Sequence, residues 1–131
     1  MLAGFRLSSI IETVPVGIGL EHDPPYLNAA GVGETTCGVR QIFDALRYVE
    51  LSAGRERPYP NAPRTLDVDL ILAGNGVINE PDLQVPHPRF RERRFVLDPL
   101  AEIAPDLLDP VTGLTIRELR DLLVQKERAG A

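Results

Sequence analysis

Hydrophobic and polar residues alternate along residues 5–13, with every second residue from Phe5 to Ile11 on one face. This period of two predicts a β-strand. The next segment, residues 17–26, contains two glycines and two prolines and predicts a loop. Residues 26–36 are rich in small residues and predict a second extended segment. We expect the two extended segments to pair as an antiparallel arm.

A helical pattern follows at residues 39–54, where apolar residues recur every three to four positions. The apolar stripe consists of Val39, Ile42, Phe43, Leu46 and Val49. Gly54 stands where a C-terminal cap belongs. The pattern therefore predicts a helix that faces the core along this stripe, followed by a proline-rich loop over residues 55–63.

Apolar and polar residues alternate again at residues 65–72, which predicts a strand. The strand is followed by a hairpin-like turn at residues 74–76. The turn leads to a short strand at residues 77–78. Residues 81–89 are proline-rich and predict another loop.

The C-terminal third of the chain is predicted to be helical. Residues 95–103 predict a short helix bent at Pro99. Thr115 and Glu118 have the spacing of a capping box, which predicts a last helix.

This order of elements predicts an α+β fold with helices on one face of a mainly antiparallel sheet. The predicted order begins with two strands, a helix and a strand. The same order remains when the first strand and helix are removed from a ferredoxin-like split βαβ sandwich. A chain of 131 residues fits one core, so we expect a single domain over residues 1–131.

The composition excludes several classes of protein. Hydrophobic residues make up 44% and charged residues 25%, which argues against disorder and fibrous repeats. No apolar run approaches a membrane span and the N-terminus lacks a signal peptide's apolar segment, so we expect a cytoplasmic protein. With one cysteine, Cys37, and two histidines, His22 and His87, no Cys/His zinc site can form. Any metal would be held mainly by oxygen.

The net charge of −5 argues against a nucleic-acid partner. The basic residues are nevertheless concentrated in short segments of the chain. Thirteen of the fourteen basic residues are arginines. Two short windows hold seven of them: Arg55, Arg57, Arg64, Arg89, Arg91, Arg93 and Arg94. Arginine binds phosphate oxygens bidentately, so these clusters indicate a small anionic ligand. Solvated loops in an arginine-rich protein are the alternative.

Asp67 and Asp69 lie two residues apart on a predicted strand, so both carboxylates project from one face. Such a pair suits Mg²⁺, which binds one or two carboxylates together with water and phosphate oxygens. Arginines in the adjacent loop would neutralise phosphate charge, a combination typical of phosphoryl transfer. A Walker-type glycine loop is absent. The alternative is a strand whose aspartates simply face water.

Four further residues could contact a ligand. His87 lies between two prolines, and a rigid loop could aim its imidazole at a phosphate, although taken alone such a histidine is more often a structural loop residue. Tyr26 and Asn28 share a strand face, and an aromatic ring beside an amide suits a base-like ring. Phe95 could belong to the same site or to the core.

Residues 62–71, Ala-Pro-Arg-Thr-Leu-Asp-Val-Asp-Leu-Ile, resemble the signature of the 6-hydroxymethyl-7,8-dihydropterin pyrophosphokinase family. Five further segments resemble this family in the same order: residues 8–17, 25–29, 50–57, 85–88 and 93–105. The resemblance covers about residues 5–123. It implies transfer of pyrophosphate from ATP to the pterin alcohol in folate biosynthesis, which gives the pterin diphosphate and AMP.

The resemblance also implies roles for individual residues. Asp67 and Asp69 would hold two Mg²⁺ ions and, with Arg55 and Arg64, form the catalytic set. The ATP phosphates would be bound by Arg55, Arg57, Arg64, His87 and Arg93. The pterin pocket would consist of Thr13, Val16, Tyr26, Asn28 and Phe95, with the two aromatic rings stacked on either side of the pterin. The loop of residues 55–63 would close over ATP as a lid.

Two departures from the family pattern stand out. Asn61 occupies a position where many members have an aromatic residue. The family's first strand, glycine turn and helix have no counterpart before Phe5. Without that first strand, the neighbouring strands of the sheet would have exposed edges, which would favour self-association. The alternatives are a catalytically impaired paralogue or fragment that binds nucleotide or pterin without turnover, and a sequence that begins at an internal methionine.

Overall fold

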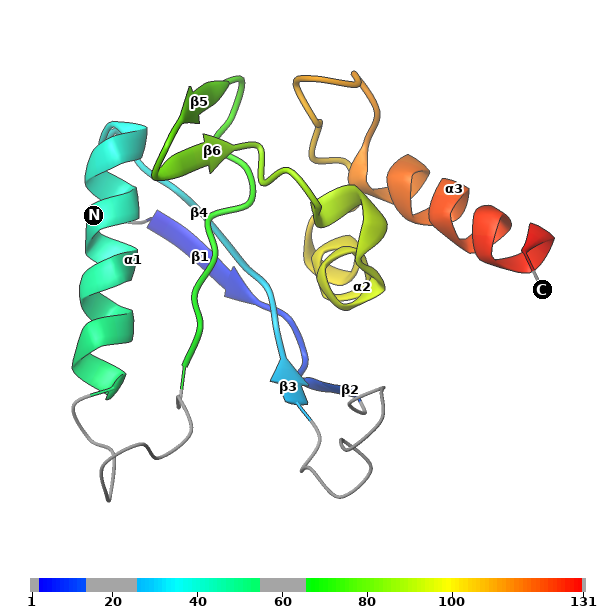
Figure 1. Ribbon diagram of the computed structural model, residues 1–131, viewed down its shortest axis with the longest axis horizontal. Coiled ribbons are helices and arrows are strands. Elements are labelled where there is room, and N and C mark those ends of the chain that lie inside the picture. The colour runs from blue at the N-terminus through cyan, green and yellow to red at the C-terminus, as the bar shows by residue number, and fades with distance from the viewer. Residues whose placement is uncertain (1–2, 14–25, 55–65, 131) are drawn as a thin grey trace. The chain divides into compact units, whose positions relative to one another are not determined.

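The computed structural model describes residues 3–13, 26–54 and 66–130 (Figure 1). The chain divides into two compact units. The first unit comprises Met1–Thr35 and Arg89–Ala131, and the second comprises Thr36–Pro88. Helices and antiparallel strand pairs occur together, which confirms the α+β class.

The first unit contains two antiparallel strand pairs that follow one another along the same two segments. β1 (Ala3–Leu7) pairs with β4 (Gly31–Glu34), and β2 (Ile11–Thr13) pairs with β3 (Tyr26–Asn28). The predicted antiparallel arm is therefore confirmed, although each predicted strand is split into two.

Three helices complete the first unit: η1 (Phe90–Glu92), α2 (Arg94–Ile103) and α3 (Ile116–Ala129). The helix predicted at residues 95–103 is α2, and it contains Pro99. The predicted capping box is present, because the Thr115 hydroxyl accepts the Glu118 N–H and the Glu118 carboxylate accepts the Thr115 N–H, both at 3.1 Å. The buried apolar residues of these helices are Phe90, Leu97, Leu100, Ile116 and Leu119.

A fully buried carboxylate, Asp109, holds the loop between α2 and α3. It accepts two hydrogen bonds from Arg91, at 2.6 and 2.9 Å, and others from the Val111 N–H and the Thr112 hydroxyl. Burial alone would raise the pKa of Asp109, but the bonds from Arg91 and Thr112 outweigh it and lower the pKa to about 2. The ion pair of Arg91 and Asp109 was not predicted from the sequence.

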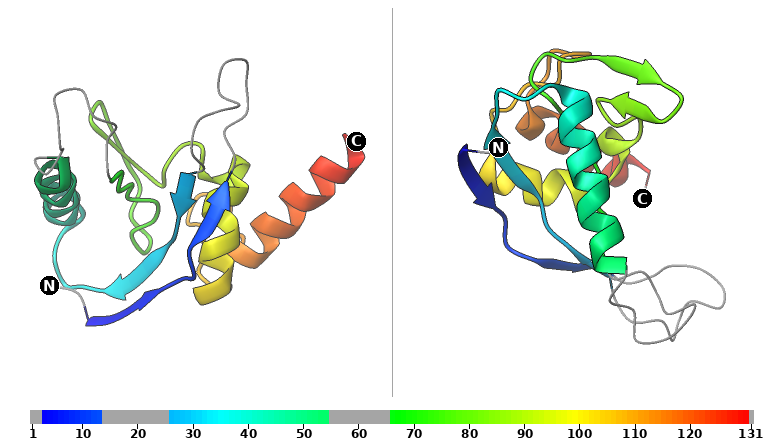
Figure 2. Two further views of the ribbon diagram at one scale, coloured as in Figure 1. Left: turned by 90° about the horizontal axis from the view of Figure 1, so that it is seen from below. Right: turned by 90° about the vertical axis from the view of Figure 1, so that its left-hand side faces the viewer.

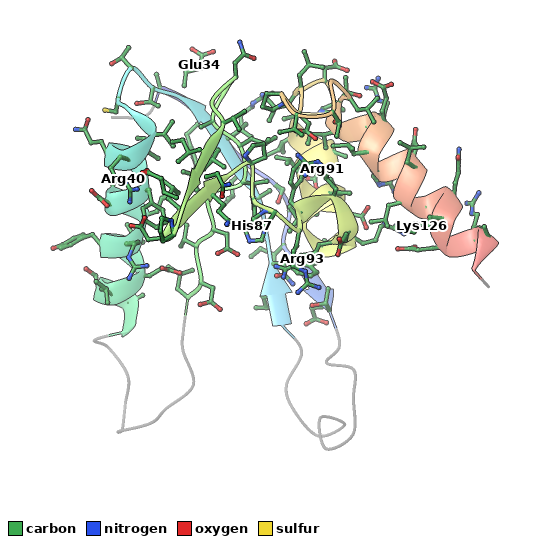
Figure 3. The ribbon with its side chains drawn as sticks, turned by 45° about the horizontal axis from the view of Figure 1, so that its top comes forward. Glu34, Arg40, His87, Arg91, Arg93 and Lys126 are labelled. Atoms are coloured by element: carbon green, nitrogen blue, oxygen red, sulfur yellow. The ribbon has the colours of Figure 1, made fainter. Side chains whose placement is uncertain are left out.

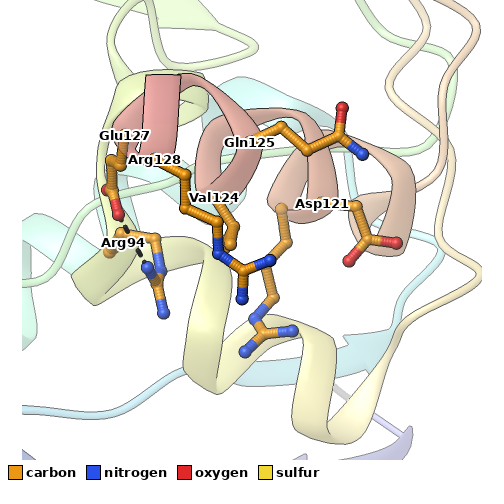
Figure 4. A pocket seen from close by; sticks show the side chains of 7 residues that line it. Arg94, Asp121, Val124, Gln125, Glu127 and Arg128 are labelled. Atoms are coloured by element: carbon orange, nitrogen blue, oxygen red, sulfur yellow. Dashed lines mark hydrogen bonds and ion pairs between the residues drawn. The ribbon is translucent and has the colours of Figure 1, made fainter. Parts of the chain in front are cut away.

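Ion pairs join α2 to α3. Arg94 binds Asp98 and Glu127, and Arg120 binds Asp98 at 2.6 Å. Burial favours the neutral acid at Asp98, yet the bonds from Arg94 and Arg120 lower its pKa. Arg94, Arg120 and Glu127 line a cavity of about 500 Å³ along α3, where Figure 4 shows the Arg94–Glu127 pair.

The second unit contains α1 (Val39–Gly54), whose bounds agree with the predicted helix. The predicted apolar stripe is wrong at one position, since Val49 is 46% exposed and the next residue, Glu50, is half-buried. At the start of α1, Arg40 forms ion pairs with Glu80 and Asp82 at 2.7 and 2.6 Å (Figure 3). These contacts fix α1 against the hairpin that contains the two acids.

That hairpin consists of β5 (Ile78–Glu80) and β6 (Leu83–Val85), and it differs from the predicted one. The turn at residues 74–76 is present, with Gly74 at a φ of +56° and the Gly76 N–H bonded to the Ala73 carbonyl at 2.9 Å. However, β6 lies inside the segment predicted to be a loop. Leu83 and Val85 are buried with an exposed residue between them, a strand pattern that the flanking prolines obscured.

The strand predicted at residues 65–72 is also wrong, because residues 66–73 contain no strand. The physical reason for the missing strand is that the Val68 N–H donates to the carboxylate of Glu50, at 2.7 Å, instead of to a neighbouring strand. Within the described ranges, no helix combines the length and the apolar character needed to cross a membrane.

Candidate functional site

Asp67 and Asp69 lie on an extended but irregular segment of the second unit. Both residues are exposed, whereas Val68 and Leu70 are half-buried. Exposure therefore alternates as in a strand, although no strand forms. The two aspartates therefore lie on the exposed side of the segment, and Val68 and Leu70 lie on the more buried side.

Two hydrogen bonds from neighbouring elements hold this segment. The Glu50 carboxylate on α1 accepts the Val68 N–H at 2.7 Å. Three residues further on, the Ile71 carbonyl accepts the His87 N–H at 2.9 Å. The second bond joins the loop after β6, which contains His87 (labelled in Figure 3), to the segment two residues after Asp69.

Asp69 and His87 line one cavity of about 370 Å³ in the second unit. Its apolar lining comes from Phe43, Leu46, Val68, Leu70 and Leu83. Its remaining polar side chains include Arg47, Glu50 and Gln84. Polar and apolar side chains line the cavity in similar proportion, and its volume lies within the range of small-molecule sites.

The donor set suits a hard cation that also binds a ligand. Among the described residues, no group of three or more His, Cys, Asp or Glu side chains could hold a metal ion. Asp67 and Asp69 alone would leave most coordination positions to water and ligand oxygens. Mg²⁺ accepts that arrangement and often binds phosphates in this way. The residues present therefore fit a magnesium–phosphate ligand.

In the first unit, Thr13 and Asn28 lie on the same face of the β2–β3 pair. The cross-strand partners are Ile11 with Asn28 and Thr13 with Tyr26, so Ile11, Thr13 and Asn28 share one face. The Asn28 amide donates to the Thr13 hydroxyl at 3.0 Å, and both side chains are half-buried. This bond fixes the orientation of the amide.

Phe95, near the start of α2, is 38% exposed and therefore is not part of the buried core. The guanidinium of Arg93 lies 5.5 Å from the centre of the Phe95 ring. Since α2 contacts both β2 and β3, the ring belongs to an element that packs on the strands of Thr13 and Asn28.

The remaining predicted site residues lie outside the described residues. They are Val16, Arg55, Arg57 and Arg64, together with the lid of residues 55–63 and Asn61. The backbone of Tyr26 belongs to β3. The described site residues thus fall into two sets: Asp67, Asp69 and His87 in the second unit, and Thr13, Asn28, Arg93 and Phe95 in the first.

Two glutamates with evident positional roles were not predicted. Glu50 binds the segment of the two aspartates, and Glu102 on α2 binds Ser9 between β1 and β2. A signal for Glu50 was available, because it follows Leu46 by four residues and so continues the apolar stripe with a charge. Glu102 offers no comparable pattern.

An exposed carboxylate pair beside a cavity that His87 also lines could bind Mg²⁺ together with phosphate oxygens of a ligand. A model of the 7,8-dihydro-6-hydroxymethylpterin-pyrophosphokinase (HPPK) family matches residues 2–105. The chain belongs to this family.

Individual relatives agree with the family match. The chain is 40% identical over 93 residues to the 2-amino-4-hydroxy-6-hydroxymethyldihydropteridine pyrophosphokinase of Pseudomonas aeruginosa, covering 71% of this chain and 57% of that protein. It is 35% identical over 125 residues to the Bacillus subtilis protein of the same name, covering 95% and 73%. Folic acid synthesis protein fol1 of Pneumocystis carinii is 34% identical over 122 residues, covering 93% and 16%. The chain therefore spans less than two thirds of the Pseudomonas and Pneumocystis proteins.

Proposed function

We propose that this chain transfers a pyrophosphoryl group from ATP to 6-hydroxymethyl-7,8-dihydropterin in folate biosynthesis, with AMP as the second product. The observation that carries the proposal is the shared cavity of Asp69 and His87, next to Asp67, in a chain of the pyrophosphokinase family. The carboxylates suit the metal, and the cavity suits the nucleotide.

On the ATP side, Asp67 and Asp69 would hold two magnesium ions, which supply charge neutralisation to the phosphate oxygens. His87 would bind a phosphate from the stiff loop after β6. The phosphates would also be bound by Arg55, Arg57, Arg64 and Arg93. Arginine forks suit this task because they donate two parallel hydrogen bonds to phosphate.

The nucleotide base would occupy the apolar part of the cavity. Phe43, Leu70 and Leu83 provide contacts for a flat ring, and Gln84 provides both a donor and an acceptor. The cavity is continuous with Asp69, so a base bound there leads its phosphates toward the carboxylates.

On the pterin side, Thr13, Asn28 and Phe95 support a ring site between α2 and the β2–β3 pair. The amide of Asn28 would read the edge of the ring, while Phe95 and Tyr26 would stack on its faces. Val16 completes the proposed set.

The reaction requires positioning and charge neutralisation. The hydroxymethyl oxygen attacks the β-phosphorus of ATP and forms a P–O bond. The bond from that phosphorus to the oxygen bridging the α-phosphorus breaks, AMP leaves with the bridging oxygen, and the hydroxyl proton passes to water. Arg55 and Arg64 would neutralise the charge that develops on the leaving phosphate.

Three further statements belong to the proposal. We propose a single domain over residues 1–131 with the ferredoxin-like split βαβ arrangement, which is supported by the family match over residues 2–105. Self-association is supported by β1, whose residues are all exposed, Phe5 and Leu7 included. We also propose a cytoplasmic location for the chain.

The test is an enzyme assay that detects AMP in the presence of ATP, Mg²⁺ and the pterin alcohol. AMP that forms only when all three are present supports the proposal. Absence of AMP, with ATP binding preserved in calorimetry, contradicts turnover and indicates a chain that only binds its ligands.

A further inference from the structure

The two strand pairs of the first unit are separated by a junction. β1 ends at Leu7 and β2 begins at Ile11, while β3 ends at Asn28 and β4 begins at Gly31. Across this junction the Ser8 N–H donates to the Ala30 carbonyl, and the Ala30 N–H donates to the Ser8 hydroxyl, both at 2.8 Å. Ser8 is 6% exposed, so the junction itself is well packed.

The adjacent residue, Ser9, is bound by the end of α2. Its N–H donates to one carboxylate oxygen of Glu102 at 3.0 Å, and its hydroxyl donates to the other at 2.7 Å. The hydroxyl and N–H of Ser9 lower the pKa of Glu102, so the carboxylate is charged at neutral pH. Both donors of Ser9 are therefore used by one side chain from a different element.

This contact has a defined geometric relation to the pterin-side residues. Phe95 precedes Glu102 by seven residues, which is two turns, so both lie on one face of α2 about 10 Å apart along its axis. Thr13 follows Ser9 by four residues, about 13 Å along a strand. The contact therefore lies at one end of α2 and β2, and Phe95 and Thr13 lie toward the other end.

Figure 2 shows α2 beside β2 and β3, running opposite to β2, and both strands contact α2. Fixing the two elements at the Ser9–Glu102 end sets the separation of their other ends. A flat ring bound between Phe95 and the Thr13–Asn28 pair would be sensitive to that separation, because stacking contacts weaken over fractions of an ångström.

We infer that Glu102, acting through Ser9, is a positioning residue that sets the width of the pterin site between α2 and the β2–β3 pair. This inference rests on the proposed function, because it requires a pterin at that place. Glu102 does not touch the ring in this account. It holds the helix that carries Phe95 at the correct distance from Asn28 and Thr13.

The experiment measures pterin and ATP affinities by calorimetry on four forms of the full chain: unchanged, Glu102→Ala, Ser9→Ala and the double variant. We expect Glu102→Ala to weaken pterin binding about fivefold and to leave ATP binding unchanged. Ser9→Ala removes only the hydroxyl bond and keeps the N–H bond to Glu102, so its effect on pterin binding should be smaller. The double variant should bind like Glu102→Ala, because that variant already removes both bonds. Glu12→Ala is the matched control, since Glu12 is exposed on β2.

The outcomes separate the inference from the proposed function. No pterin binding by the unchanged chain overturns both. Pterin binding that is equal in all forms overturns only the positioning role, as does a parallel loss of ATP affinity or a fully additive double variant. Glu102→Gln serves as a further variant in case Glu102→Ala does not fold. It keeps one acceptor oxygen for Ser9. A pterin affinity between those of the unchanged chain and Glu102→Ala supports the inference. Affinity in Glu102→Gln as low as in Glu102→Ala, with an unchanged melting curve, argues against it.

Discussion

The carboxylate of Glu50 accepts a hydrogen bond from the Val68 N–H at 2.7 Å, and Val68 is the residue between Asp67 and Asp69. A side chain of α1 thus supplies the hydrogen bond that a neighbouring strand would otherwise supply. Because Glu50 is half-buried, the bond is partly protected from water. A third carboxylate, that of Glu50, therefore binds the backbone between the two exposed aspartates.

Removal of that hydrogen bond should loosen the carboxylate pair. We predict that Glu50→Ala raises the Mg²⁺ concentration needed for half-maximal turnover several-fold and lowers kcat about tenfold, at unchanged pterin affinity. Steady-state kinetics over a magnesium series measures both effects. Asp44→Ala, on the exposed side of α1, is the control. Equal kinetics in Glu50→Ala and the control would contradict the role of the hydrogen bond.

Asp69 tests the metal role more directly, since it lines the cavity and is exposed. We predict that Asp69→Ala lowers magnesium-dependent turnover by at least about a hundredfold without unfolding the chain. Circular dichroism checks the fold and AMP release checks the activity. Retained turnover, or a collapsed spectrum, would count against Asp69 as a metal ligand.

The ring-binding role of Phe95 can be separated from core packing, because the side chain is 38% exposed. Phe95→Leu keeps an apolar side chain on α2 and removes the aromatic face. We predict about a tenfold loss of pterin affinity with a small change in melting temperature. Titration calorimetry measures the affinity. A large loss of stability with unchanged affinity would instead identify Phe95 as a core residue.

The acid stability of the chain should depend on Asp109. Its folded-state pKa of about 2 is below the ordinary 3.8, so the charged form stabilises the fold above about pH 4. As the pH falls from about 4 toward 2, this contribution of about 2 kcal/mol is lost. Asp109→Asn should therefore reduce stability at neutral pH and flatten the loss in acid. Urea unfolding between pH 2 and 7 measures both, and parallel pH curves for the two proteins would contradict it.

Self-association through β1 makes a separate prediction. Phe5 and Leu7 are 58% and 63% exposed on one strand face. Leu7→Lys should shift the sedimentation profile toward the monomer, because a charge on an exposed strand opposes pairing with a second copy. A monomeric profile for the unchanged chain would contradict self-association.

Local patterns predicted much of the fold. The bounds of α1, the capping box of α3 and the antiparallel arm all depend on residues close in sequence or on simple alternation. The hairpin of β5 and β6 was not predicted, because prolines on both sides of Leu83–Val85 resemble a loop. Residues 66–73 alternate like a strand, but their hydrogen bond goes to Glu50, a contact that no local pattern reports.

The candidate site was predictable where chemistry is concentrated in short motifs. Asp67, Asp69 and His87 stand out by residue type and spacing, and the structure adds the cavity that Asp69 and His87 share. Glu50, Glu102 and Asp109 act through long-range contacts, with partners 18, 93 and 18 residues away. Such contacts require the folded chain, so the sequence alone could not assign them.

The most direct test of the central claim is phosphorus NMR of the chain with ATP, Mg²⁺ and 6-hydroxymethyl-7,8-dihydropterin. The account predicts AMP and the pterin diphosphate in equal amounts, with no product in the Asp69→Ala variant. ADP with a pterin monophosphate would show attack at the γ-phosphorus and contradict pyrophosphoryl transfer. Unchanged ATP in the presence of all components would contradict catalysis by this chain.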